Sequence, residues 1–194
     1  MRRVLPLIAA LALLGGCSQT TNGSATPDGS GSTSADRTSG SSKPTSTSDE
    51  PAKRPKTINI ESMDPCTLLT DAQRTEFGLD RPPKLDEVPG KPGCSIGRED
   101  RKFSLAIYLD STRGIETYTE PPRPNATKMQ VGGFPAVLLE STTALGLACS
   151  VIVDVSDGQF VDVQAASLGD TDVKKLCEIV QPIAGAVVTN LMSK

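Results

Sequence analysis

A stretch of forty residues near the N-terminus, positions 18–57, limits where this chain can build a hydrophobic core. Ser and Thr fill 18 of these positions and Gly and Pro another eight, whereas the only apolar side chains are three alanines. Such a segment cannot bury enough apolar surface to offset the entropy lost on ordering, so we expect it to be disordered. The core must therefore come from residues 58–194, which suffice for one domain of ordinary size.

The first seventeen residues have the pattern of an export signal. Arg2 and Arg3 precede an apolar run over positions 4–14, which is shorter than the roughly 20 residues of a membrane-spanning helix. The run leads through Gly-Gly to Cys17 and closely resembles the bacterial lipobox, in which the cysteine receives a diacylglyceryl group. The resemblance implies a signal peptide over 1–16 and a stable lipid anchor on Cys17. The alternative is an ordinary signal peptide with a chance cysteine.

These segments predict a protein that is lipid-anchored on the outer face of the cytoplasmic membrane. Residues 17–57 are then the lipidated cysteine and its tether, and residues 58–194 are a single domain. This domain carries 13 basic and 19 acidic side chains, a balance of −6. That charge disfavours adhesion to an anionic membrane surface, so the lipid must hold the protein there, and it gives nucleic acid no basic footprint.

Histidine and tryptophan are absent from the chain. Without His, no Ser-His-Asp triad, Cys-His pair or His-ligated metal site can form. Four cysteines remain after Cys17, and no two of them form a CxxC pair. An even number of cysteines in an exported protein favours disulfides over a metal site or a catalytic thiol.

Capping and alternation signals place helices at both ends of the domain and strands between them. Asp64 before Pro65 is a helix start, and Asp71 begins a second one. The expected elements are helical turns over 64–78, a loop over 80–93, strands over 94–98 and 103–109, a Pro-rich loop over 110–127, and strands over 129–131 and 134–140 that flank a Gly-Gly turn.

The clearest hairpin joins the alternating runs that surround residues 156–158. A three-residue loop pairs Val153 with Val161, whereas a two-residue turn would set Val153 opposite Asp162. We therefore expect the three-residue loop, with Gly158 in the left-handed conformation.

The last helix opens near 169–171 and carries a long apolar face. Its apolar members are Val173, Leu176, Cys177, Val180, Ile183, Ala184, Val187, Val188 and Leu191. Pro182 removes one backbone donor and is expected to kink or divide the helix. The fold class that follows is α+β, an antiparallel sheet flanked by an N-terminal and a C-terminal helix.

Three disulfide pairings are open to four cysteines. Cys149 lies on the inward phase of its strand and Cys177 on the face that its helix must bury, so those two are expected to meet. Cys66 and Cys94 then tie the first helix to the first strand. We therefore expect the pairs Cys66–Cys94 and Cys149–Cys177.

Carboxylates are the remaining candidates for chemistry. The available pool is Asp86, Glu87, Asp110, Glu140, Asp154 and Asp162. Asp154 and Asp162 fall on the outward phase of their strands, where solvated surface is expected, and together with Asp157 they lack an EF-hand pattern. Because charges fall mostly on turns and outward phases, we expect no buried working carboxylate, no catalytic residue, no cofactor and no metal ion. The loops over 80–93 and 110–127 are long enough to form a site that periodicity does not reveal.

Several short motifs together resemble a known group. They are the lipobox with its Ser/Thr-rich tether, the Asp-Pro-Cys-Thr-Leu-Leu run at 64–69, Pro-Gly-Cys at 92–94, Val-Gly-Gly-Phe-Pro-Ala at 131–136 and a last helix that contains Cys177. Cell-envelope lipoproteins of high-GC Gram-positive bacteria that share a C-terminal domain of unknown function have this arrangement. The group supplies no activity to carry over. A more distant likeness to PsbP-like sandwiches concerns the fold alone.

Two classes of function remain. We expect a non-enzymatic module that binds a protein partner or an envelope component while its lipid holds it at the membrane. The alternative is a carrier or sensor of a small apolar or lipid ligand. A dry cavity between sheet and helices, lined by such residues as Leu105, Val137, Leu139 and Val187, would favour the carrier.

Overall fold

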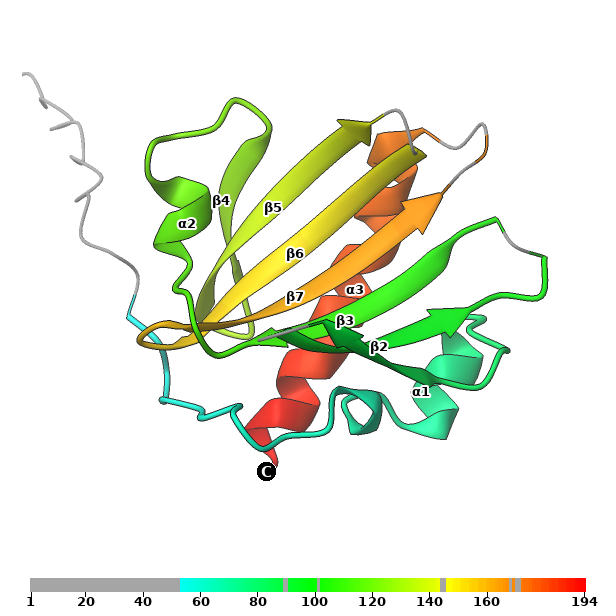
Figure 1. Ribbon diagram of the computed structural model, residues 1–194, viewed down its shortest axis with the longest axis horizontal. Coiled ribbons are helices and arrows are strands. Elements are labelled where there is room, and N and C mark those ends of the chain that lie inside the picture. The colour runs from blue at the N-terminus through cyan, green and yellow to red at the C-terminus, as the bar shows by residue number, and fades with distance from the viewer. Residues whose placement is uncertain (1–52, 89–90, 101, 144–145, 168, 170–171) are drawn as a thin grey trace, which may run out of the picture. The chain divides into compact units, whose positions relative to one another are not determined.

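The computed structural model of the protein describes residues 53–88, 91–100, 102–143, 146–167, 169 and 172–194 (Figure 1). The expected signal peptide, Cys17 and the tether up to residue 52 lie outside these residues. The described chain begins at Lys53, five residues before the expected start of the domain at Ile58. None of the described helices combines the length and the apolar character needed to cross a membrane.

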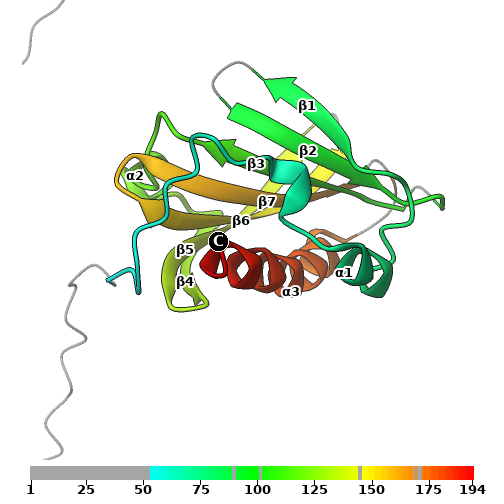
Figure 2. The same ribbon diagram turned by 90° about the horizontal axis from the view of Figure 1, so that it is seen from below.

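Seven antiparallel strands form one sheet in the order β1-β2-β3-β7-β6-β5-β4. The strands are β1 (Lys84–Val88), β2 (Lys91–Gly97), β3 (Ser104–Asp110), β4 (Ala126–Val131), β5 (Phe134–Thr143), β6 (Gly146–Ser156) and β7 (Gln159–Ser167). The helices are the 3-10 turn η1 (Pro65–Thr67), α1 (Asp71–Glu76), α2 (Glu116–Thr119) and α3 (Val173–Met192). Helix α3 lies across one face of the sheet and α1 lies on the same side (Figure 2). The expected α+β class is confirmed.

Side-chain caps fix where the helices begin. The Asp64 carboxylate accepts a hydrogen bond from the Cys66 amide at 2.8 Å and opens η1, which is only a 3-10 turn. Thr70 and Gln73 form a reciprocal capping box at the start of α1. Asp172 caps α3 through the Lys174 amide. The two helix starts expected at Asp64 and Asp71 are therefore both present, as two short pieces.

Two of the expected loops contain regular structure. The segment 80–93 holds β1 and the start of β2, and the segment 110–127 holds α2 and the first residues of β4. Pro83 precedes β1 and Pro92 lies beside the edge strand β1, opposite Glu87. Proline is tolerated at position 92 because β2 pairs with β3 only from Gly93 onward, so no ladder hydrogen bond to β3 is lost there. The prolines therefore lie near the ends of strands, and the prediction of a continuous loop over 80–93 was wrong.

The β6–β7 hairpin has the expected register but a different turn. Val153 pairs with Val161, and Gly158 has a φ of +68°. Ser156 pairs with Gln159, so the loop holds two residues and the extra residue is a bulge at Val155 within β6. The Val155 carbonyl accepts a hydrogen bond from the Ile58 amide at 2.9 Å, which ties the entering chain to the bulge.

The core lies between the sheet and α3. Of the nine apolar residues expected on α3, all but Val173 are buried. Pro182 lies inside α3 without dividing it, because the buried residues Val180 and Ile183 on either side keep both halves against the sheet. Both expected disulfides are present: a sheet–helix disulfide, Cys149–Cys177, and a turn–strand disulfide, Cys66–Cys94.

Candidate functional site

The two faces of the sheet are built differently. One face packs on α3 and contains the apolar residues that alternation predicted. We call the opposite side the open face; strand pairing places Tyr108, Asp110, Val137, Ile152, Phe160 and Asp162 on it. In Figure 1 the open face is turned toward the viewer, with α3 behind the sheet and the short helix α2 in front of it.

Aromatic side chains gather on the open face, beneath and beside α2. Phe160 of β7 is fully buried, although α3 lies on the other side of the sheet. Tyr118 of α2 packs against it edge-on, with ring centroids 5.4 Å apart. Tyr108 lies on β3, the strand that neighbours β7 in the sheet. Both tyrosines of the chain therefore belong to this face.

Gly93 makes room for the Tyr108 ring. Strand pairing sets these two residues opposite each other on β2 and β3. A Cβ atom added at Gly93 would lie only 2.4 Å from a carbon of the Tyr108 ring, well below van der Waals contact. The ring can therefore lie on β2 only because position 93 has no side chain.

A buried ion pair crosses the centre of this face. Lys91 Nζ donates to Asp162 Oδ2 at 2.9 Å, and the exposed fractions of the two side chains are only 17% and 7%. The same ammonium lies 4.6 Å from the centre of the Tyr108 ring and 5.7 Å from that of Phe160. Asp162 Oδ1 is buried and has no hydrogen-bond partner among the described residues.

Two further aspartates are fixed by cations. Asp110 accepts hydrogen bonds from the Thr112 amide and hydroxyl and from the Arg113 amide and guanidinium. Asp154 pairs at 2.9 Å with Arg54, which also reaches Asp157. Arg54 belongs to the segment expected to be tether, so these ion pairs hold the end of that segment against the open face.

The environment of this cluster shifts several pKa values. Burial would raise the pKa of Asp110, but hydrogen bonds from Thr112 and Arg113 outweigh it and lower the pKa below its usual range. Burial raises the pKa of Asp154 despite the hydrogen bond from Arg54. Burial also raises the pKa of both tyrosines, and the negative charges of Asp86 near Tyr108 and of Asp162 near Tyr118 act in the same direction.

A shallow recess of about 60 Å³ lies next to Tyr118. Its lining comes from α2, the following loop and the outer strands β4 and β5: Tyr118, Thr119, Pro122, Arg123, Ala126, Lys128 and Val137. The wall is thus partly apolar and carries two cations. Neither Arg123 nor Lys128 was singled out from the sequence: Arg123 lies in the segment 110–127, which was expected to be loop, and Lys128 directly follows that segment.

The expectation that Asp154 and Asp162 are solvated on the outward phases of their strands was wrong. Both are at least nine-tenths buried, as is Asp110, because α2, Lys91 and the entering segment cover this part of the face. Alternation in β6 and β7 correctly predicted which face of the sheet each side chain points to. It does not predict which other segment covers that side chain. Lys91 lies on β2 and Asp162 on β7, with β3 between them, and Arg54 lies on no strand, so no pairing of neighbouring strands signalled these ion pairs.

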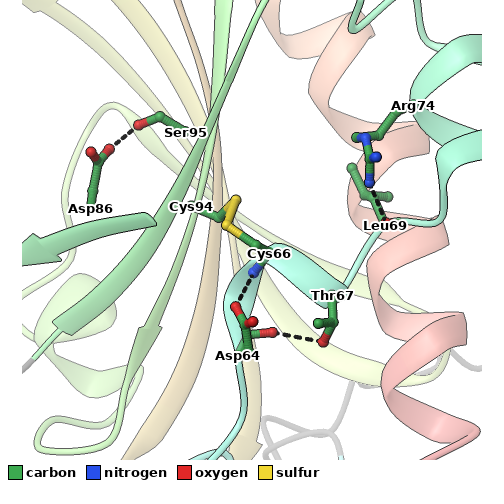
Figure 3. The surroundings of a disulfide bond; sticks show 8 residues. All are labelled: Asp64, Cys66, Thr67, Leu69, Arg74, Asp86, Cys94 and Ser95. Carbon is green, nitrogen blue, oxygen red and sulfur yellow. Dashed lines mark hydrogen bonds between the residues drawn. A yellow bond between two sulfur atoms is a disulfide. The ribbon is translucent and has the colours of Figure 1, made fainter. Parts of the chain in front are cut away.

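The rest of the carboxylate pool is more scattered. Asp86 accepts a hydrogen bond from Ser95 on β2, and Figure 3 shows Ser95 on one side of that strand and the Cys94 disulfide on the other. Glu140 is half-buried on β5. Asp157 is exposed in the β6–β7 turn. The side chain of Glu87 lies outside the described residues.

The four residues named for a carrier cavity do not meet. Leu105 and Val187 are buried in the core between the sheet and α3. Val137 and Leu139 lie on the open face, because they pair with Ile152 and Ser150. These four side chains therefore line no common cavity.

No group of three potential ligands is placed to hold a metal ion within the part of the chain that the structure describes. Comparison with curated proteins finds no match to the chain. A family model described as "Protein of unknown function (DUF3558)" matches residues 12–190, which is most of the sequence. The match confirms the expected relationship to a family with a domain of unknown function. The chain belongs to the DUF3558 family.

Proposed function

We propose that this protein is a lipid-anchored, extracytoplasmic binding or accessory module whose open face holds a protein or another envelope component. A lipid on Cys17 tethers it to the outer face of the cytoplasmic membrane. The module is not an enzyme, uses no cofactor and does not act on nucleic acid. The observation that carries the binding role is the open face, on which aromatic and ion-paired side chains lie beneath a helix of only four residues.

The proposed location has two supports. The lipobox-like run before Cys17 follows a basic start and precedes a long polar segment. Both disulfides require an oxidising compartment, which is typical of exported proteins. Cys17→Ala tests the anchor: we expect the variant in the medium, or in the membrane as an uncleaved precursor. A processed, unlipidated form that still sediments with membranes would contradict the anchor.

The non-enzymatic part of the proposal follows from how the charges are held. Lys91, Arg54 and Arg113 each pair with one of the three buried aspartates. A general base must be free to accept a proton from a substrate within hydrogen-bond reach. Carboxylates that are buried and already paired serve better to shape and stiffen a surface.

A carrier or sensor of a small apolar or lipid ligand is the alternative proposal. It needs an apolar cavity, whereas Leu105 and Val187 pack into the core and Val137 and Leu139 face the other way. We therefore favour the binding module. For the fold, we also propose a PsbP-like sandwich, which α3 on one side of the sheet and α2 on the other support (Figure 2).

Site-specific photo-crosslinking in living cells tests the binding face. A photoreactive amino acid is placed at Ser104 of β3 or at Glu116 of α2, both exposed on the open-face side, and at Lys175 or Glu178 of α3 as the matched control. We expect the same adduct from both open-face positions and none from α3. Adducts from the α3 positions alone would refute the open face as the binding surface.

A further inference from the structure

The recess beside Tyr118 has a fixed cation on its rim. The Arg123 guanidinium lies 5.5 Å from the centre of the Tyr118 ring and donates from Nη2 to the Thr117 carbonyl at 2.7 Å. Stacking and this hydrogen bond hold the group in place while most of its five N–H donors stay unused. A guanidinium that is already ordered loses little further entropy when it binds a ligand.

Lys128 supplies a second cation from the opposite wall. It is exposed on β4, on the same face as Val137, its partner on β5. Among the described residues, no carboxylate lies within salt-bridge distance of Lys128 or Arg123. The other cations of the open face, Lys91, Arg54 and Arg113, are all paired with aspartates.

Two unpaired cations on one recess are notable in a domain with six more acidic than basic side chains. Glu116 on α2 and Glu120 directly after it form no salt bridge with either cation among the described residues. The floor and walls between the cations are Val137, Ala126 and Pro122, which offer no competing acceptor from their side chains.

We propose that this recess binds a small oxyanion, a phosphate or carboxylate group, through Arg123 and Lys128. This inference rests on the proposal that the open face is the binding surface, and it names the chemistry of the ligand. A recess of about 60 Å³ holds a few heavy atoms, which suits the charged end of a larger molecule. The guanidinium fork fits two oxygens of such a group, and the Tyr118 ring forms the apolar side wall.

The test is a nuclear magnetic resonance titration of the full chain in an uncharged maltoside detergent. Sodium phosphate and sodium acetate are added at constant ionic strength while the amide signals of Tyr118, Thr119 and Ala126 are followed. We expect saturable shifts. The double variant Arg123→Gln/Lys128→Gln should bind at least tenfold more weakly. The matched control, Lys174→Gln/Lys175→Gln on α3, removes the same charge on the other side of the sheet and should stay within twofold of the wild type.

A second arm separates the sources of the oxyanion. Doping the micelles with phosphatidylglycerol, against phosphatidylcholine, tests a lipid headgroup; saturation by inorganic phosphate or acetate alone indicates a soluble ligand. Absence of saturable shifts with every probe, or equal binding by the two double variants, would overturn the oxyanion site. Photo-crosslinks from Ser104 and Glu116 would in that case still support the open face as the binding surface. Saturable shifts combined with crosslinks from α3 alone would overturn the binding face and leave the oxyanion site.

Discussion

Removing either partner of the Lys91–Asp162 pair should destabilise the domain, and by unequal amounts. Lys91→Met leaves the Asp162 carboxylate nine-tenths buried with neither oxygen paired within the described part of the chain, since Oδ1 already lacks a partner there. Asp162→Leu leaves the Lys91 ammonium over the Tyr108 and Phe160 rings, with 17% of its side chain exposed. The cation thus keeps favourable contacts that the anion does not have.

The magnitudes follow from the geometry. At 2.9 Å and an effective dielectric constant near 20, the charges attract by about 6 kcal/mol, most of which offsets the cost of removing both from water. When only the lysine is removed, the cost of keeping the carboxylate away from water is no longer offset. We therefore expect Lys91→Met to lower the free energy of unfolding by about 3–5 kcal/mol. Asp162→Leu should cost about 1–2 kcal/mol, because the two rings and solvent still stabilise the ammonium.

The double variant Lys91→Met/Asp162→Leu completes the cycle. It replaces a buried ion pair by apolar side chains of similar length and should lie within about 1 kcal/mol of the wild type. Urea unfolding followed by circular dichroism measures all four proteins, with the disulfides kept oxidised. A cost below about 1 kcal/mol for Lys91→Met, or additive costs in the double variant, would show that the two charges do not form a buried, coupled pair.

Three further predictions concern single features of the fold. Replacing both cysteines of either disulfide with alanine removes a constraint over 28 positions, worth about 3.5 kcal/mol. Loss of the sheet–helix disulfide should destabilise the domain more, because both its cysteines are buried, and equal urea midpoints for the two double variants would contradict this. Gly93→Ala should cost about 1–3 kcal/mol through the clash with Tyr108, and Tyr108→Ala should remove most of that cost in a double variant. Because the pKa of Asp110 is lowered in the folded state, its contribution to stability is present above its unfolded pKa and is lost as the pH falls through the folded pKa. Arg113→Gln should raise the folded-state pKa of Asp110 in a carbon-detected titration, and an unchanged pKa would refute the pairing.

The face that packs on α3 could be predicted closely from the sequence. Alternation in β3, β6 and β7 gave the direction of the buried side chains, and the 3.6-residue period gave the buried stripe of α3. The pairing of Cys149 with Cys177 followed because both cysteines lie on those two faces. Hydrophobic patterning is informative here because one face of each element is covered by a single large partner.

The open face could not be predicted in the same way. A polar residue on the outward phase of a strand is solvated unless some other segment covers it, and periodicity contains no information about that segment. For Asp154 the cover is Arg54, a hundred positions away and in a stretch expected to be tether. For Asp162 it is Lys91, in a stretch that its prolines marked as loop. Long-range ion pairs of this kind need the fold before they can be recognised.

Under the proposed function, recognition belongs to the rim cations Arg123 and Lys128, whereas stability comes from the core against α3 and from the ion pairs of the open face. Apolar burial against α3 and the sheet–helix disulfide stabilise one side of the sheet, and substitutions there act through cavities and lost packing. On the other side, the buried aspartates and their cations form a stiff floor, while Arg123 and Lys128 are exposed and contribute little to folding. Substitutions at these two positions should change binding without changing the unfolding midpoint.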